Sequence, residues 1–143
     1  MSRTYAGGQP RNCEQLLTVY QTRIRSTLEF AAPVFHSGLT LDQSRQLEMI
    51  QKKALVIILG VNYTSYESAL SELNVERLDH RRTELCYSFA LKCTKSPKHN
   101  SMFPLNNRVN SRNPKPYKEF PCKSSRYFNS PIPYLSRLLN TRA

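Results

Sequence analysis

A proline that interrupts a strong helical pattern constrains this chain more than any other feature. Ahead of it, apolar residues recur every four positions, at Leu16, Tyr20, Ile24 and Leu28, with Leu17 and Ala31 widening the stripe. Pro33 lacks an N–H, and its ring clashes with the preceding turn of a helix. The pattern therefore predicts an amphipathic helix over residues 14–31 that stops before Pro33, with Phe35 packing the corner that follows.

A capped restart follows within a few residues. Thr40 and Gln43 form a capping-box pattern, in which the Thr40 hydroxyl accepts a backbone N–H and the Gln43 side chain reaches back. The second helix is predicted to end at Gly60, because glycine adopts the left-handed conformation at a helix end without strain. Its predicted apolar face comprises Leu47, Ile50, Ala54, Ile57 and Ile58.

Two further helices are predicted. A second box at Thr64 and Glu67 opens a short helix that runs to about Leu73. A fourth helix covers residues 76–95, and its predicted inner face comprises Leu78, Leu85, Phe89 and Cys93. No alternating strand pattern persists and no internal repeat is present, so we predict an all-α fold, a small bundle of about four helices.

The last part of the chain differs in composition. Residues 97–143 hold nine Lys and Arg against the single acid Glu119, together with seven of the nine prolines. Such a segment buries too little apolar surface to offset the entropy of ordering it. We therefore expect a disordered segment over residues 1–12, a helical domain over residues 13–96 and a Pro-rich, basic, largely disordered tail over residues 97–143. Within that tail, residues 134–139 are expected to form a helical turn or a docking motif.

The sequence offers little for catalysis. It has no glycine-rich phosphate loop, and its two aspartates, Asp42 and Asp79, lie on different predicted helices. Buried structural thiols are expected on the packed face of the fourth helix. No zinc-knuckle spacing is found among the four candidate ligands, Cys86, Cys93, His99 and Cys122. We therefore predict a non-catalytic chain without a metal or a cofactor.

The cysteine pattern also bears on the compartment. No C-x-x-C pair and no secretory signal is present, so the four thiols are expected to be free in a reducing compartment, the cytosol or the nucleus. The longest apolar run, residues 54–59, is far shorter than the ~20 residues of a membrane span. No membrane-spanning segment is predicted.

Basic residues are the remaining signal. The formal charge of +11 over 143 residues favours a polyanionic partner, most commonly nucleic acid, although ribosomal RNA or an anionic membrane surface would fit the charge equally well. Six basic residues occur as close pairs on three predicted helices: Arg23 and Arg25, Lys52 and Lys53, and Arg81 and Arg82. If those faces lie together, they form a stripe that contacts a phosphate backbone. The alternative is that they are solvated or pair within their own helices.

The run LLTVYQTRIRSTLEFAAPVFHSGLTLDQSRQLEMIQKKALVIILG, residues 16–60, resembles the region after the polymerase core in reverse transcriptases of LINE-type, non-long-terminal-repeat retrotransposons. The shared string comprises Arg25, Glu29-Phe30-Ala31, Pro33-Val34-Phe35, Leu39-Thr40, Gln43-Ser44, Leu47-Glu48, Ile50-Gln51, Lys52-Lys53, Ile57-Ile58 and Gly60. The similarity continues through Arg81-Arg82 and fades near residue 105, so it covers about residues 13–105. The family commonly has Tyr where Phe30 stands and Trp where Phe35 stands, and both departures keep an aromatic ring.

This resemblance implies the thumb and the region just after it in an RNA-directed DNA polymerase, which packs on the palm domain and helps to hold the template–primer duplex. The family's metal-binding aspartates lie upstream, in an aromatic-alanine-Asp-Asp motif with no counterpart here, and its endonuclease domain is also absent. Residues 1–10 resemble a translation start inside a truncated copy of such an element, or a gene model drawn over one. The expected partners are an RNA/DNA template–primer duplex and the missing palm domain. Two alternatives stay open: a protein-interaction or self-association module, and a transposon remnant without a function.

Overall fold

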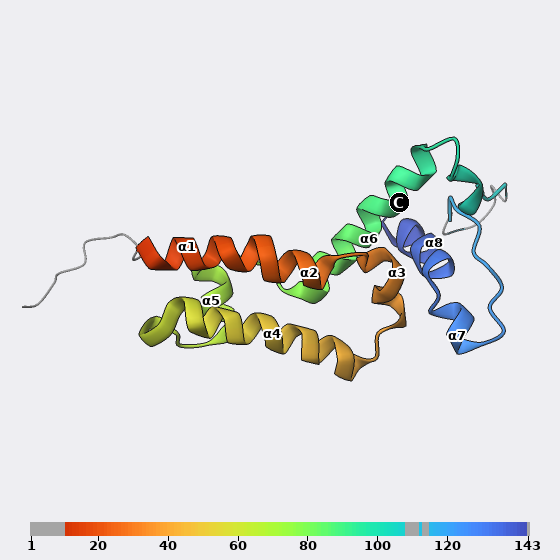
Figure 1. Ribbon diagram of the computed structural model, residues 1–143. Coiled ribbons are helices and arrows are strands. Elements are labelled where there is room, and N and C mark those ends of the chain that lie inside the picture. Colours follow the sequence, from red (N-terminus) through yellow and green to blue (C-terminus); the bar gives the residue numbers. More distant parts are fainter. Residues whose placement is uncertain (1–10, 108–111, 113–114, 143) are drawn as a thin grey trace, which may run out of the picture. The chain divides into compact units, whose positions relative to one another are not determined.

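The regular structure of the described residues is helical. The computed structural model describes residues 11–107, 112 and 115–142 (Figure 1). Within these ranges it contains helices and one isolated antiparallel bridge between Leu105 and Tyr117, so the predicted all-α class is confirmed. Of the predicted N-terminal segment, residues 1–10 lie outside the described residues, and α1 begins at Arg11.

The helices divide between two compact units. The first unit comprises residues 1–30 and 45–78, and the second comprises residues 31–44 and 79–143. Composition instead predicted one helical domain that ends at residue 96. The structure differs because the corner over residues 31–44 packs against α8 (Pro131–Thr141) and hydrogen-bonds to α6 (Leu78–Lys95).

The first unit is built on two antiparallel helical segments. α1 (Arg11–Val19), a π-helix (Tyr20–Arg25) and α2 (Ser26–Glu29) follow one another without a break. Most of α4 (Leu41–Leu59) runs back beside them, followed by a 3₁₀ turn (Gly60–Asn62) and α5 (Tyr66–Glu72) (Figure 1). The core of this unit comprises Cys13, Tyr20, Leu55, Ile58, Leu59, Ala69, Leu73 and Val75.

The first helix ends at Glu29 and not at Ala31 as predicted. A helix that continued through Pro33 would place the proline ring against the carbonyl group of Glu29, four residues earlier. Phe30 leaves the helix with a ψ of 127°, and Ala31 adopts a left-handed φ of 55°. Pro33 then lies in the first turn of α3 (Ala32–Phe35), where its missing N–H has no helical partner to lose. A 3₁₀ turn, His36–Gly38, leads on towards α4.

The buried face of α1 and the π-helix is Cys13, Leu17 and Tyr20, so the predicted stripe is partly wrong: Leu16 and Ile24 are exposed. The wider turn of the π-helix changes the phase of a four-residue repeat. Side-chain hydroxyls also donate to backbone carbonyls four residues earlier, at Thr18, Thr22, Ser26 and Thr27. Such bonds bend helices, which a count of apolar spacing does not reveal.

The predicted apolar face of α4 also needs correction. Ile50 is exposed and Ile57 is 70% exposed, whereas the buried residues of this helix are Gln51, Leu55, Ile58 and Leu59. The phase of the helix is set by the amide side chain of Gln51, which is fully buried. A polar residue at the centre of the buried face hides that face from a search for apolar periodicity.

Gln51 is held by a polar network inside the first unit. Its Oε1 accepts a hydrogen bond from the Tyr20 hydroxyl at 2.5 Å. Its Nε2 donates to the Tyr66 hydroxyl and to the carbonyl oxygen of Glu76, each at 2.9 Å. Tyr66 in turn donates to the Glu48 carboxylate, and burial together with this bond raises the pKa of Tyr66. The network ties α4 to the π-helix, to α5 and to the segment before α6.

Helix ends follow the local signals closely. The Gln43 N–H donates to Thr40 Oγ1 at 3.2 Å and the Thr40 N–H donates to Gln43 Oε1 at 3.0 Å, so the first capping box is confirmed. Gly60 has a φ of 54°, the left-handed conformation predicted for it. The cap of α5 is Ser65, whose hydroxyl accepts the Ser68 N–H at 3.2 Å, so the predicted cap at Thr64 is one residue early.

The second unit is centred on α6 and α8. Its buried cluster comprises Cys86, Ala90 and Cys93 of α6, Leu135 and Leu139 of α8, and Phe103. The predicted inner face of α6 is confirmed at Leu78 and Cys93. It is wrong at Phe89, which is 45% exposed, because the buried positions are occupied by Arg82, Cys86 and Ala90.

The described parts of the C-terminal segment carry more structure than their composition indicates. They include a 3₁₀ turn, α7 and α8, at Asn100–Met102, Ser125–Phe128 and Pro131–Thr141. The Asn140 side chain makes two 2.9 Å hydrogen bonds with Tyr117, accepting from its N–H and donating to its carbonyl oxygen. The Ser136 hydroxyl donates to the carbonyl oxygen of Lys118 at 2.9 Å. The helical turn expected at residues 134–139 therefore belongs to a longer helix that anchors residues 117–118.

The substitution Gln51→Leu is expected to lower the free energy of unfolding by about 2–3 kcal/mol, because it removes the hydrogen bonds of Gln51 to the Tyr20 hydroxyl and to the carbonyl oxygen of Glu76. Lys52→Leu makes an apolar substitution at the exposed neighbouring position and should change the free energy by less than about 0.5 kcal/mol. Urea denaturation followed by circular dichroism measures both. Equal effects of the two substitutions would contradict a stabilising role for the network.

Candidate nucleic-acid interface

The basic charge is concentrated in the second unit. Residues 31–44 and 79–143 contain 13 Lys and Arg against 4 Asp and Glu, whereas residues 1–30 and 45–78 contain 8 against 6. The second unit therefore carries +9 of the net +11, and the first unit carries +2. The excess arises mainly from residues 85–118, which include seven basic residues and no acidic one.

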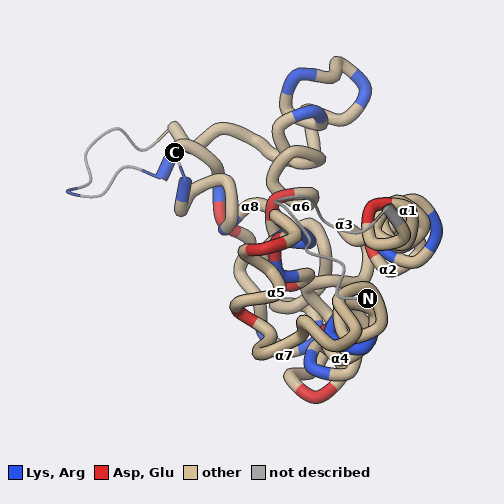
Figure 2. The backbone as a smooth tube through the Cα atoms, turned by 90° about the vertical axis from the view of Figure 1, so that its left-hand side faces the viewer, with Lys and Arg blue, Asp and Glu red and all other residues tan. Residues whose placement is uncertain are grey.

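Four of the six predicted phosphate contacts lie in the first unit. Arg23, Lys52 and Lys53 are exposed. The Arg25 side chain is 20% exposed, and its Nε lies 3.8 Å from a carboxylate oxygen of Glu29. Successive residues of an α-helix project about 100° apart, so Lys52 and Lys53 point to different sides of α4. Figure 2 shows basic and acidic residues interspersed along these helices, so this unit offers separate charges and not a stripe.

Arg82 was predicted to contact phosphate, but the structure buries it completely. Its Nε donates to His36 Nδ1 at 3.3 Å, and its Nη2 donates to the Ser44 hydroxyl at 3.0 Å. A buried cation held by hydrogen bonds is structural, because exposing it to a ligand would break those bonds. Arg81 is half-buried. The six predicted residues are thus divided between two units, and Arg82 is not part of a binding surface.

His36 is the centre of the polar cluster that holds the corner. Because Nδ1 accepts from Arg82, Nε2 carries the proton and donates to Thr83 Oγ1 at 3.2 Å. Thr83 donates onward to the carbonyl oxygen of Asp79 at 3.0 Å. The imidazole also lies edge-to-face against the Tyr134 ring, with 5.8 Å between centroids. Burial and the charge of Arg82 lower the pKa of His36.

The residues predicted to shape the corner keep local roles. Pro33 lies in the first turn of α3, Thr40 caps α4 and Gly60 ends it. Phe35 is half-buried, and the aromatic pairing at the corner is made by its neighbour His36. A single histidine has no periodicity, so the sequence did not indicate this role.

Exposed lysines of the second unit are the strongest remaining candidates for phosphate contacts. Lys92 and Lys95 lie in the last turns of α6, Lys98 follows the helix, and all three are exposed. Figure 2 shows basic residues gathered at this end of α6. Lys115 is less available, because its ammonium group lies 2.9 Å from the Glu119 carboxylate. From the sequence, these lysines could have been predicted by the lack of acidic residues over residues 85–118.

None of the four cysteines, all of which the structure describes, forms a disulfide bond, and three of them are buried: Cys13, Cys86 and Cys93. Burial raises the pKa of Cys86 to about 11, and it also raises the pKa values of Cys13 and Cys93. Since the thiolate is the reactive form, these three side chains are poor nucleophiles. The predicted packing role of Cys86 and Cys93 is confirmed.

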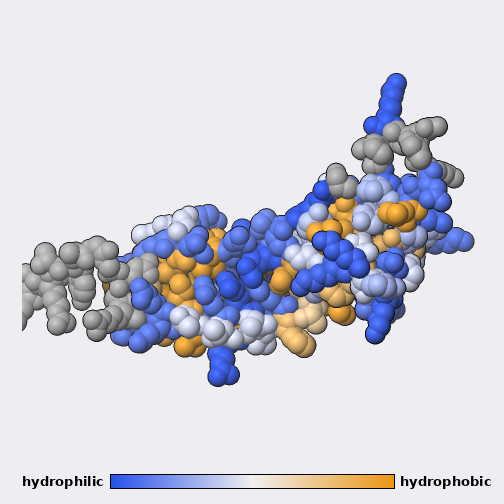
Figure 3. All heavy atoms as spheres, turned by 90° about the horizontal axis from the view of Figure 1, so that it is seen from above, coloured by the Kyte–Doolittle hydropathy of each residue, from blue (hydrophilic) through white to orange (hydrophobic). Residues whose placement is uncertain are grey.

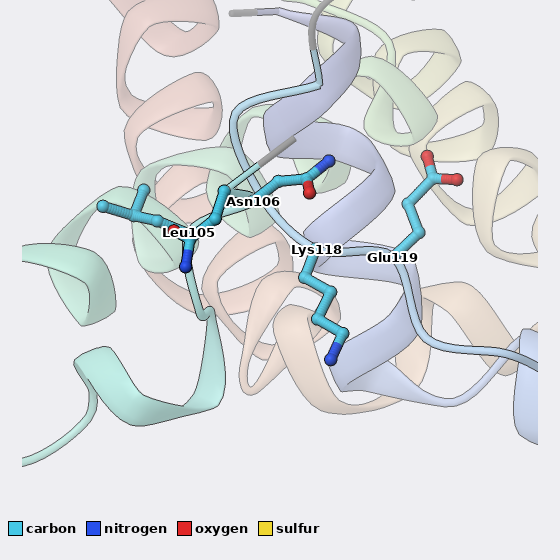
Figure 4. Close-up of a pocket in the computed structure, with 5 residues that line it drawn as sticks. Leu105, Asn106, Lys118 and Glu119 are labelled. Carbon is cyan, nitrogen blue, oxygen red and sulfur yellow. The ribbon is translucent and has the colours of Figure 1, made fainter. Parts of the chain in front are cut away.

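Other kinds of site find little support. Among the described residues, no three His, Cys, Asp or Glu side chains gather closely enough to hold a metal ion. In the same part of the chain, no helix is long and apolar enough to cross a membrane. A pocket of about 480 Å³ is lined by Leu105, Asn106, Asn107, Lys118 and Glu119. The labelled side chains around it point in different directions and do not converge on one ligand (Figure 4).

No protein-family model matches this chain, and neither does any curated protein or solved structure. A function must therefore be argued from the residues of the chain itself.

Arg82→Ala is expected to lower the free energy of unfolding by about 3 kcal/mol, because it removes the hydrogen bonds to His36 Nδ1 and to the Ser44 hydroxyl and opens a cavity. Arg126→Ala removes the same side chain from an exposed position and should cost less than about 0.5 kcal/mol. Urea denaturation and nucleic-acid affinity are measured on both variants. An Arg82→Ala protein that is as stable as the control but binds nucleic acid more weakly would show that Arg82 is a phosphate ligand.

His36 is expected to make stability depend on pH. Its pKa in the folded state is lowered from 6.5, so the unfolded chain takes up a proton first as the pH falls. The unfolding free energy should be flat above about pH 7.5 and fall below about pH 6.5, by at most about 1.4 kcal/mol per pH unit for one proton. Denaturation at each pH measures this. The slope should be lost in His36→Gln and kept in His80→Gln, an exposed position on α6; a slope that persists in His36→Gln would contradict the assignment.

Proposed function

We propose that this chain is a helical thumb-like segment of a LINE-type reverse transcriptase, an RNA-directed DNA polymerase, which binds template–primer nucleic acid and is non-catalytic on its own. The ordered string of residues 16–60 is the reason for naming this family. The palm domain of the parent polymerase would supply the catalytic aspartates. The chain's own contribution is a set of rigid helices and a surplus of positive charge.

The positions of the resembling residues support a structural role for the string. Glu29-Phe30-Ala31 covers the end of α2, and Pro33-Val34-Phe35 forms most of α3. Leu39-Thr40 precedes α4, and Gly60 follows it. The string therefore coincides with the places where helices end and begin again, and rigid helices of this kind are what a duplex-holding module needs.

The observation that carries nucleic-acid binding is the excess of nine positive charges in the second unit together with the exposure of Lys92, Lys95 and Lys98. Lysines that neutralise phosphates release condensed counterions, and this makes the affinity depend on salt. A surface of this kind binds the backbone without reading sequence. That is suited to a polymerase, which has to hold every template in turn.

The proposal predicts salt-dependent binding of an RNA–DNA hybrid by the purified chain. The logarithm of the binding constant should fall with the logarithm of salt concentration with a slope of about −3 to −6, which corresponds to about three to seven phosphate contacts. Fluorescence anisotropy or filter binding measures this. Polyglutamate, a polyanion without bases or phosphates, is the control competitor. No binding at low ionic strength, or equal competition by polyglutamate, would contradict the proposal.

A second candidate function is protein interaction, and an exposed apolar face of α4 favours it. Apolar side chains are exposed there and just after the helix, at Met49, Ile50, Val56, Ile57 and Val61. Figure 3 shows further hydrophobic residues among charged ones on another face, the one seen from the side of the first unit on which α1 lies. Large exposed apolar areas mark interaction surfaces. Light scattering after size exclusion separates the candidates: a mass that rises with concentration, and falls back in Ile57→Lys, favours self-association, whereas a constant monomer disfavours it.

A further inference from the structure

The outer face of the second half of α6 combines positive charge with an aromatic ring. Phe89, Lys92 and Lys95 are exposed, while Cys86, Ala90 and Cys93 of the same helix are buried, so Phe89 lies at the edge of the buried face and the two lysines lie farther from it. Residues three apart are neighbours on a helix surface. Lys92 therefore lies next to both Phe89 and Lys95, and the three side chains form one short row, here called the Phe89 row.

The exposure of Phe89 is not explained by packing. It lies outside the buried cluster of the second unit, and 45% of its surface is open to solvent. Phe128 in the same unit is also exposed, but the Arg137 guanidinium lies 3.5 Å above its ring. Among the described residues, no such cation covers Phe89. The exposed part of the side chain is therefore available to a ligand.

In the part of the chain that the structure describes, no acidic side chain pairs with Lys92 or Lys95. No Asp or Glu occurs in residues 85–118. The preceding acid on α6, Glu84, is paired with Arg142 at 2.7 Å. Lysines at the end of a helix do interact favourably with its dipole, which accounts for part of their placement. The dipole does not account for an aromatic ring beside them.

We propose that the Phe89 row binds single-stranded nucleic acid, with one base stacked on the Phe89 ring and the flanking phosphates at Lys92 and Lys95. Proteins that bind single strands combine such basic residues with aromatic stacking platforms. In a duplex the faces of the bases are stacked on each other, so an open ring favours an unpaired strand. This inference rests on the proposed function and narrows it: the row holds an unpaired part of the template or primer.

Binding of a fluorescent 12-mer of oligo(dT), of oligo(rU) and of a 12-base-pair RNA–DNA hybrid to the full chain tests this by anisotropy. Phe89→Leu is expected to weaken single-strand binding about tenfold, the loss of one stacked base, and to leave hybrid binding within about twofold. Phe89→Tyr keeps a ring and should bind like the unmodified chain. Phe30→Leu, at a phenylalanine that is 80% exposed in the first unit, is the matched control and should have no effect.

The charges are tested in the same assay. Lys92→Gln with Lys95→Gln should reduce the salt slope for a single strand by about 1.4, the value for two phosphate contacts. Lys52→Gln with Lys53→Gln removes the same charge from the first unit and should change the slope less. Circular dichroism confirms that each variant is folded.

The outcomes separate this inference from the function on which it rests. If folded Phe89→Leu binds single strands as well as the unmodified chain does, the row is not the site, and hybrid binding still supports the proposed function. If Phe89→Leu weakens hybrid and single strand equally, the preference for unpaired bases is wrong. If the unmodified chain binds neither ligand at low salt, the proposed function and the row both fail.

Discussion

A buried guanidinium decides how this chain is divided. Arg82 on α6 donates to His36 and Ser44, which lie on either side of the Thr40 cap. Burying a charged group is costly unless hydrogen bonds compensate for the lost water, and these two bonds hold the segment from His36 to Ser44 against α6. Residues 31–44 therefore belong to the second unit although they lead into α4 of the first. Pro33 and the left-handed Ala31 allow this, because they end the first helix and redirect the chain.

The same interaction determines which cations are open to a ligand. With Arg82 buried and Arg25 next to Glu29, more of the exposed cations among the described residues lie in the second unit than in the first. A role in holding nucleic acid requires no carboxylate cluster and no reactive thiol. It requires rigid helices and uncompensated positive charge. The proposed function therefore relies only on features that the described residues carry.

Short sequence motifs predicted where helices begin and end, whereas polar contacts between residues far apart in the sequence could not be predicted. The capping box at Thr40 and the left-handed Gly60 depend on a few neighbouring backbone groups, so a short pattern was enough. The faces of α4 and α6 were misassigned because each has a polar residue, Gln51 or Arg82, in its buried stripe, and the partners lie far along the chain.

Overall composition was also misleading. Residues 97–143 were predicted to be disordered because they are rich in proline and basic residues, and this average did not indicate the apolar stripe of α8. Adjacent basic residues such as Lys52 and Lys53 are easily noticed in a sequence, but they point to different sides of a helix. Basic residues three apart are neighbours on the helix surface and are better candidates for a phosphate-binding surface.

The central claim is that exposed cations of the second unit bind nucleic acid while the buried cation Arg82 holds the fold. The most direct measurement is an amide chemical-shift titration of the isotope-labelled full chain with an RNA–DNA hybrid that has a single-stranded overhang. The account predicts saturable shifts centred on residues 88–98, suppressed by added salt, with little change at Gln51 or Arg82. Shifts centred on Arg82 and His36, or no shifts at low ionic strength, would contradict it.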